Sequence, residues 1–131
     1  PEEDFIPFLV EADVLLDTIH FGGGFTSLLA FSCGLPVVTL RGQFMRGRLT
    51  LALYKQMEVM DCVVNDPQSY VDLALRLANE KPFRELIIER IQARSEVLFD
   101  DMEAVFELER FFIWAHNLKE AREMSGRENL S

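Results

Sequence analysis

Short apolar runs alternate with stretches of helical periodicity along most of the chain. The runs are apolar throughout, as strands buried on both faces of a parallel sheet are. They lie at residues 14–16, 37–40 and 62–64. Around them, apolar residues recur three and four positions apart, which predicts helices at residues 2–11, 26–33, 44–57, 67–79 and 82–98. This alternation predicts the α/β class, with a partial parallel sheet and flanking helices.

Local signals and helical spacing refine these elements. Pro7 predicts an interruption of the first helix, which would carry Phe5, Phe8 and Leu9 on one side. Asp66 suits the N-cap of the helix that starts at residue 67. The spacing predicts these inward side chains for the later helices: Leu49, Ala52, Leu53, Met57, Val71, Ala74, Leu75, Ala78, Phe83, Leu86, Ile87, Ile91, Val97 and Leu98.

A long last helix is predicted from a cap at Asp100 or Asp101 to about Lys119. It carries apolar residues on more than one face, including Phe106, Phe111, Phe112 and Trp114. A surface helix needs only one apolar stripe. We therefore expect this helix to be packed on two sides or to lack part of its partner. A second copy of the chain could cover it, so a homodimer through this helix is possible.

The two ends of the chain bear on its organisation. The chain has no initiator Met and opens inside a predicted helix, so we expect it to be cut from a longer protein. We expect one partial domain at residues 1–120, followed by a polar, frayed tail at residues 121–131.

Consecutive glycines at residues 22–24 join the first apolar run to the helix at 26–33. Thr26 and Ser27 are suited to cap that helix, and Gly34 ends it before the second run. The order strand, loop, helix, strand predicts a βαβ unit whose loop lies at the carboxyl end of a strand. Uncovered glycine amides and the positive end of a helix together favour a phosphate. The alternative is that the glycines only form a turn, since a lone glycine loop is weak support for a site.

The distribution of charge favours an anion site. The chain has 22 acidic and 13 basic residues, a formal net charge of -9. Between Asp17 and Glu58 it has no carboxylate at all, although Arg41, Arg46, Arg48 and Lys55 lie there. A buried core would exclude carboxylates too, but it would also exclude arginines. The segment with the glycine loop is therefore predicted to present a surface to an anion.

Composition excludes several other classes. The acidic balance argues against nucleic acid as a partner, and no apolar run is long enough to span a membrane. Cys33 and Cys62 are too few for a disulfide framework or a zinc site, so we expect two buried thiols in a reduced, cytoplasmic protein. No metal or cofactor is expected.

Several segments together resemble one family, the O-GlcNAc transferase/SPINDLY glycosyltransferases, and its bacterial members most of all. The matching segments are residues 12–18, 20–24, 34–39, 44–48, 61–63, 70–71 and 107–111. They occur in order and nearly without gaps, so the resemblance is far more specific than the glycine loop alone.

The resemblance implies the later part of the carboxyl-terminal domain of a GT-B fold, in which two Rossmann-like domains face each other across a cleft. Its implied activity is inverting transfer of a sugar, typically GlcNAc from UDP-GlcNAc, to a hydroxyl acceptor, most often on protein. The donor is a substrate, and no cofactor is implied. The missing first domain would hold the acceptor site and the acid–base groups, so the catalytic residues are unknown and this chain alone would be inactive.

The resemblance also carries over a set of nucleotide-sugar-binding positions. They are Gly22, Gly23, Gly24, Phe25, Thr26, Ser27, Leu29 and Arg48. Gly24 and Phe25 stand where family members have Asn, His or Thr. Leu29 stands where they have a carboxylate for the ribose hydroxyls, and a leucine cannot accept hydrogen bonds.

Other residues near the loop have simpler interpretations. Thr26 and Ser27 can serve as helix caps as well as phosphate ligands. Arg46 is expected to be solvent-exposed. His20 is expected to orient the loop and Asp17 to bond loop amides, rather than to act in catalysis. Two hypotheses follow: a donor-binding portion of a glycosyltransferase, or a degenerate, non-catalytic module that serves protein interaction, as Phe25 and Leu29 would suggest.

Overall fold

The computed structural model describes residues 5–128, and their side chains as far as residue 119. It divides into two compact units, residues 1–99 and residues 100–131. The predicted start of the first helix at residue 2 and the end of the predicted tail, residues 129–131, lie outside the described residues.

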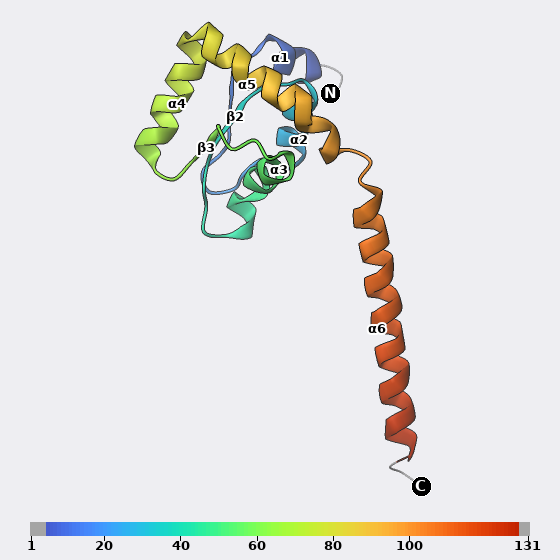
Figure 1. The fold of residues 1–131 in the computed structure, drawn as a ribbon. Coiled ribbons are helices and arrows are strands. Elements are labelled where there is room, and N and C mark those ends of the chain that lie inside the picture. The colour runs from blue at the N-terminus through green and yellow to red at the C-terminus, as the bar shows by residue number, and fades with distance from the viewer. Residues whose placement is uncertain (1–4, 129–131) are drawn as a thin grey trace. The chain divides into compact units, whose positions relative to one another are not determined.

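The first unit is built on three parallel strands in the order β1-β2-β3, with helices around them (Figure 1). The strands are β1 (Leu15–Leu16), β2 (Val37–Leu40) and β3 (Val63–Val64). Leu15 pairs with Val37, and Thr39 pairs with Val63. All three strands were predicted, and the α/β class is confirmed.

The helices of the first unit follow the predicted order with shifted ends, but the helices predicted at residues 44–57 and 82–98 are each divided into an α-helix and a short 3-10 helix. They are α1 (Phe5–Glu11), α2 (Phe25–Ser32), η2 (Met45–Gly47), α3 (Leu49–Met57), α4 (Pro67–Asn79), α5 (Lys81–Arg94) and η3 (Ser95–Leu98). The predicted interruption at Pro7 is wrong, because Pro7 lies in the first turn of α1, where its missing N–H costs no hydrogen bond.

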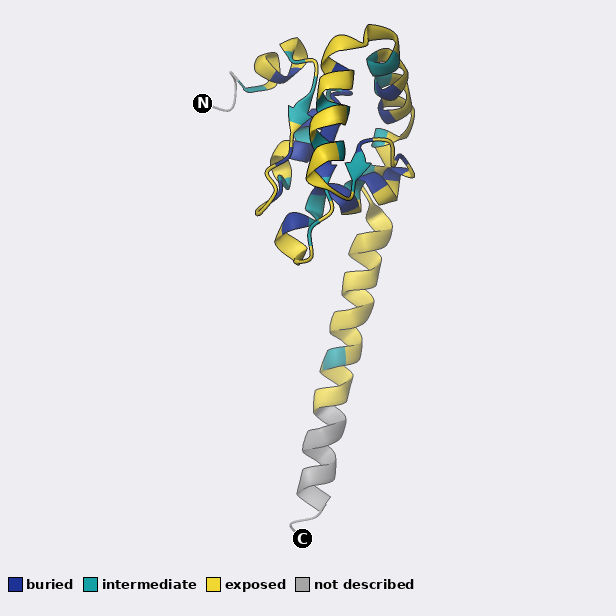
Figure 2. Ribbon diagram, turned by 90° about the vertical axis from the view of Figure 1, so that its left-hand side faces the viewer, coloured by how far each residue is buried: buried dark blue, intermediate teal, exposed yellow. Residues whose placement is uncertain are grey.

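The core of the first unit lies between the strands and their helices (Figure 2). Tyr54 of α3 is fully buried, and its hydroxyl both donates to the Val37 carbonyl and accepts from the Val37 amide, each at 2.9 Å. Phe31 of α2 meets its ring edge-on, with the centroids 4.7 Å apart. Burial raises the pKa of the Tyr54 hydroxyl well above its usual range, and burial also raises the pKa of the Cys62 thiol to about 12. The expectation of a buried thiol holds for Cys62, whereas Cys33 is only half-buried.

The predicted inward face of α4 is largely wrong. Tyr70, Leu73, Ala74 and Leu77 face the core, while Val71, Leu75 and Ala78 are exposed. Similar shifts of one position leave Ala52 of α3, Leu86 of α5 and Phe8 of α1 exposed, and Val97 of η3 is exposed as well. The predicted inward Ile87 and Ile91 of α5 are both fully buried.

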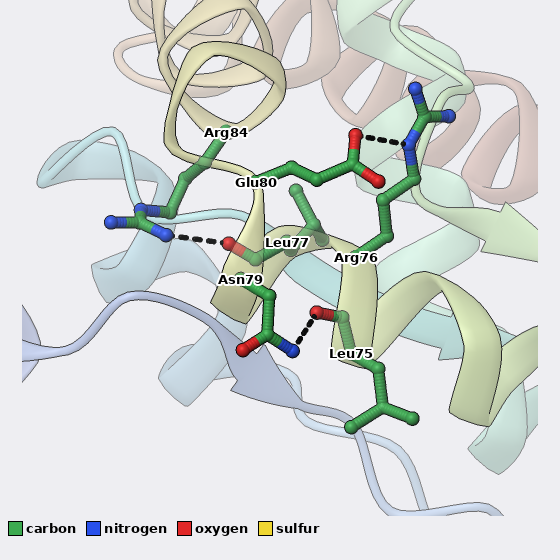
Figure 3. A network of polar contacts seen from close by, with 6 residues as sticks. All are labelled: Leu75, Arg76, Leu77, Asn79, Glu80 and Arg84. Atoms are coloured by element: carbon green, nitrogen blue, oxygen red, sulfur yellow. Dashed lines mark hydrogen bonds and ion pairs between the residues drawn. The ribbon is translucent and has the colours of Figure 1, made fainter.

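The turn from α4 to α5 is held by polar contacts to the last carbonyls of α4 (Figure 3). Asn79 donates to the Leu75 carbonyl at 2.7 Å, and Arg84 donates to the Leu77 carbonyl at 2.7 Å. Arg76 pairs with Glu80 at 3.0 Å. The Arg84 guanidinium thereby satisfies a carbonyl that the end of α4 leaves without a partner inside the helix.

The second unit is the helix α6 (Met102–Glu128), which continues beyond the predicted end near Lys119. Asp101 caps it, as expected, by accepting from the amides of Glu103 and Ala104. As far as residue 119, its large apolar side chains are exposed, among them Phe111, Phe112 and Trp114. Over the described residues, no helix is both long and apolar enough to cross a bilayer.

Candidate functional site

The glycine loop lies between the end of β1 and the start of α2, as the sequence predicted. Asp17 follows β1 directly, and its carboxylate is almost fully buried beneath the loop. One carboxylate oxygen accepts from the Gly23 amide at 2.6 Å, and the other accepts from the Thr39 hydroxyl at 2.7 Å. The expectation that Asp17 bonds a loop amide is confirmed.

A second contact fixes the other side of Asp17. The Tyr70 hydroxyl of α4 donates to the Asp17 backbone carbonyl at 2.8 Å. Partial burial, and then the nearby Asp17 carboxylate, raise the pKa of the Tyr70 hydroxyl. Both effects keep Tyr70 protonated, so it stays a donor. Strands β1 and β2, the loop and α4 therefore meet at this one residue.

The backbone amides of Gly22 and Gly23 both donate hydrogen bonds within the protein. The Gly22 amide donates to the Arg46 carbonyl at 2.8 Å, and the Gly23 amide is the one that donates to Asp17. The expectation that all three glycines offer uncovered amides is therefore wrong for Gly22 and Gly23. These two hydrogen bonds join the loop to Asp17 after β1 and to the segment after β2, so the two amides are not available to a ligand.

Close packing explains why glycine occupies both positions. A Cβ on Gly23 would lie 2.6 Å from the Ser27 Oγ, closer than real Cβ atoms come to any such neighbour. A Cβ on Gly22 would lie 3.1 Å from an Asp17 carboxylate oxygen. At Gly24 the nearest atom, the Leu49 Cδ1, is 3.5 Å away, an ordinary contact. Gly22 and Gly23 thus serve the packing of the loop, and Gly24 is sterically open.

The start of α2 has no side-chain cap. Gly24 is the N-cap residue, so the prediction that Thr26 or Ser27 caps the helix is wrong: both lie inside its first turn. Within the described chain, no side chain bonds to the first amides of α2, and its first turn has no acidic residue. These amides and the helix dipole favour an anion at this end.

Thr26 and Ser27 differ in what they offer a ligand. Ser27 is almost fully buried, and its hydroxyl lies 2.8 Å from the Thr50 hydroxyl. Thr50 in turn donates to the Gly23 carbonyl at 3.1 Å, so Ser27 must be the donor to Thr50. Phe25 and Thr26 are exposed. Ser27 therefore supports the loop, and Thr26 is the hydroxyl open to a ligand.

Leu29 lies one helical turn after Phe25. It is half-buried and packs against the core of the first unit. His20 is exposed, and its backbone carbonyl, rather than its ring, accepts from the Arg46 Nε at 3.2 Å. Arg46 is exposed, as expected.

The arginines divide into two groups by their partners. Of the arginines whose side chains are described, those outside the carboxylate-free segment all form ion pairs: Arg76, Arg84, Arg90, Arg94 and Arg110. Inside that segment, the described ion pairs include none with Arg41, Arg46 or Arg48.

The unpaired arginines line two hollows. Arg48 and Lys55 line one of about 330 Å³ along α3. Leu49 also lines this hollow, and it is the residue that packs nearest to Gly24. One wall of the hollow therefore borders the start of α2. Arg41 and Arg46 line another, of about 280 Å³, beyond the ends of β1 and β2. The residues described include no cluster of three groups that could hold a metal ion.

Three supporting residues were missed in the sequence: Thr39, Thr50 and Tyr70. Thr39 is a polar residue inside an otherwise apolar strand, which is a signal of a buried hydrogen bond. Tyr70 and Thr50 give no such signal, because they lie in amphipathic helices, where a residue with a hydroxyl group is not unusual.

Parallel strands with flanking helices and a glycine loop at the carboxyl end of β1 define an α/β domain of the Rossmann-like type. The chain belongs to glycosyl transferase family 41, whose model matches residues 2–107. The resemblance seen in the sequence is thereby confirmed.

A solved structure supports this assignment. The chain is similar to a mutant O-GlcNAc transferase from Thermobaculum terrenum, with 32% sequence identity and a TM-score of 0.76. The match covers 86% of this chain and 22% of that chain, so this chain spans only a small part of the length of its relative.

Proposed function

We propose that this chain is the donor-binding portion of a glycosyltransferase. The donor is a nucleotide sugar, UDP-GlcNAc, and the acceptor is a hydroxyl group on a protein. The observation that carries this proposal is the contrast among arginines: in the described part of the chain, those near the uncapped start of α2 form no ion pair, although the net charge is -9. An unpaired cationic surface at the strand ends of a family 41 domain suits a nucleotide diphosphate.

Each loop residue has a role in this proposal. The amides at the start of α2, from Gly24 to Ser27, and the Thr26 hydroxyl bind the diphosphate. Arg48 neutralises part of its charge from the adjoining hollow. Gly22, Gly23 and the Ser27 side chain hold the loop in shape, and Phe25 lies at its rim.

These groups would help the transfer step by stabilising the leaving group. When the bond from the sugar to the diphosphate breaks with inversion, negative charge grows on the departing diphosphate. The dipole of α2 and the Arg48 guanidinium oppose that charge, and the dipole is fixed by the fold, so it needs little reorganisation. No side chain of this chain is assigned as the general base, and we expect the isolated chain to be inactive.

A titration with UDP tests the proposal. We expect UDP to bind weakly to this chain, with chemical shift changes at the amides of residues 24–27. Arg48→Gln should weaken binding by about tenfold, because it removes a charge-assisted contact. Arg94→Gln removes the same charge far from the loop along the chain and should leave UDP affinity unchanged. No binding at millimolar UDP would contradict the proposal.

That result would favour the other candidate function, a degenerate module that serves protein interaction. Two observations support this alternative. Leu29 packs against the core where a ribose-binding carboxylate is expected, and the exposed Phe25 replaces a polar residue. The exposed aromatics of α6 would then belong to an interface, including one between two copies of the chain.

A further inference from the structure

The hollow beyond the ends of β1 and β2 lies apart from the residues assigned to the donor. It has a volume of about 280 Å³. Its walls come from two segments, one after β1 and one after β2, and are formed by Ile19, His20, Arg41, Gly42, Gln43, Phe44, Arg46 and Gly47. No residue from 22 to 27 lines it.

Arg46 is held in place at this hollow. Its Nε donates to the His20 carbonyl at 3.2 Å, and its guanidinium carbon lies 5.1 Å from the centre of the Phe44 ring. The Gly22 amide also bonds to its backbone carbonyl, so its main chain is tied to the glycine loop. A guanidinium fixed through Nε and stacked on a ring keeps its two terminal NH₂ groups for another acceptor.

Arg41 contributes the second guanidinium. Its backbone amide extends the ladder between β2 and β3 by donating to the Val64 carbonyl at 2.9 Å, which fixes its Cα beside the hollow. Its side chain is exposed and forms none of the described ion pairs. No acidic residue lines the hollow, whereas the Gln43 side chain adds an amide donor.

A third arginine-lined hollow offers a comparison within the same chain. Glu58, Asp61, Arg90 and Arg94 line it, and each arginine there is paired: Arg90 with Asp61 at 2.5 Å and Arg94 with Glu58 at 3.1 Å. The chain thus neutralises arginines with its own carboxylates there, whereas among the described ion pairs none involves Arg41 or Arg46.

We propose that the hollow of Arg41 and Arg46 is a second oxyanion site, which takes a phosphate or a carboxylate group. Two guanidinium groups can bind such a group with several charge-assisted hydrogen bonds. The group could come from a phosphorylated small molecule or from acidic side chains of an acceptor polypeptide. The site does not depend on the diphosphate assignment at α2.

Residue-resolved NMR titrations test this site, with inorganic pyrophosphate and a hexaglutamate peptide as separate probes. We expect at least one probe to shift the amide signals of Gly42 and Gly47. Arg41→Gln should weaken that binding by about tenfold. It is a clean variant, because the Arg41 side chain has none of the described ion pairs or hydrogen bonds to lose. Arg94→Gln is the matched control, with the same loss of charge, and should have no effect.

The outcomes separate the sources and the two sites. Binding of pyrophosphate alone assigns a phosphate ligand, and binding of the peptide alone assigns a carboxylate ligand. Shifts confined to residues 24–27, equal weakening by both variants, or no shift with either probe would overturn the proposal. If UDP fails to bind while Gly42 and Gly47 still respond, the donor assignment fails and the second site stands.

Discussion

Leu29 occupies a position of α2 where the family resemblance places a carboxylate. Its side chain is half-buried against the core. A leucine there adds to the apolar contact, and in the proposed donor site it would offer the ribose hydroxyls no hydrogen-bond acceptor. We therefore expect the residue to favour stability of the fold over affinity for a nucleotide.

Replacing Leu29 tests whether this position balances stability of the fold against affinity for UDP. We expect Leu29→Glu to tighten UDP binding by up to about 1–3 kcal/mol, because the new carboxylate accepts from the ribose hydroxyls. The same change should lower the free energy of unfolding by about 1 kcal/mol, since a half-buried leucine is lost. Calorimetric titration and thermal unfolding measure the two effects. Leu28→Glu is the control: it places the same charge one position earlier and should not tighten UDP binding. Unchanged or weaker UDP affinity in Leu29→Glu would contradict the role proposed for a carboxylate at this position.

Single residues also show the limits of sequence reasoning at the loop. The role of Asp17 could be predicted, because a carboxylate that ends a strand beside glycines lies near their amides. The amides of Gly22 and Gly23 were wrongly expected to be uncovered, because the Arg46 carbonyl and the Asp17 carboxylate take them. The first of these partners comes from a segment 24 positions further along the chain, and no local pattern reveals it.

At the scale of elements, the sequence predicted which helices and strands form and in what order. It did not predict which face each helix turns to the core. Asp66 and Pro67 predicted the start of α4 correctly, and Asp66 accepts from the Ser69 amide at 2.8 Å. Its inward face was wrong, because α4 carries two apolar stripes one position apart. The stripe with Tyr70 is buried since its hydroxyl reaches the Asp17 carbonyl, a contact that depends on the tertiary structure.

The glycine loop is supported by hydrogen bonds from Thr50 of α3, which contacts the Ser27 hydroxyl and the Gly23 carbonyl. Replacing Thr50 tests this support. Thr50→Val keeps the shape but leaves the Ser27 hydroxyl and the Gly23 carbonyl without their partner. We expect the free energy of unfolding to fall by about 1–3 kcal/mol, measured by urea denaturation. The matched change Thr26→Val removes an exposed hydroxyl from the same site and should alter stability by less than about 0.5 kcal/mol. Equal stability of the two variants would show that Thr50 does not support the loop.

At the scale of the whole molecule, α6 presents more apolar surface than a solvated helix usually does. Phe111, Phe112 and Trp114 are 54%, 60% and 59% exposed, and the Phe111 ring lies beside the rings of the other two. Side chains of this kind bury on the order of 150–250 Å² each when covered. Patches of several hundred Å² generally mark an interface.

We therefore expect this chain to self-associate in solution through α6. Sedimentation velocity over a range of concentrations should show a dimer or larger species, because the aromatic side chains gain free energy when another copy covers them. Phe112→Ser combined with Trp114→Ser should shift the chain to monomer. Val71→Ser combined with Leu75→Ser on the exposed stripe of α4 is the control and should not. A strictly monomeric parent chain at high concentration would contradict this role of α6.

The packing beneath the glycine loop has a consequence for how its motif is interpreted in other chains. A Cβ on Gly23 would lie 2.6 Å from the Ser27 Oγ, and a Cβ on Gly22 would lie 3.1 Å from an Asp17 carboxylate oxygen. We therefore expect both glycines to be retained for folding even in a chain that no longer binds a donor. Gly24 has no such close neighbour and Phe25 is exposed, so the fold constrains these two positions less. The paired glycines thus report on the packing of the loop, and their presence in a chain does not by itself indicate sugar transfer.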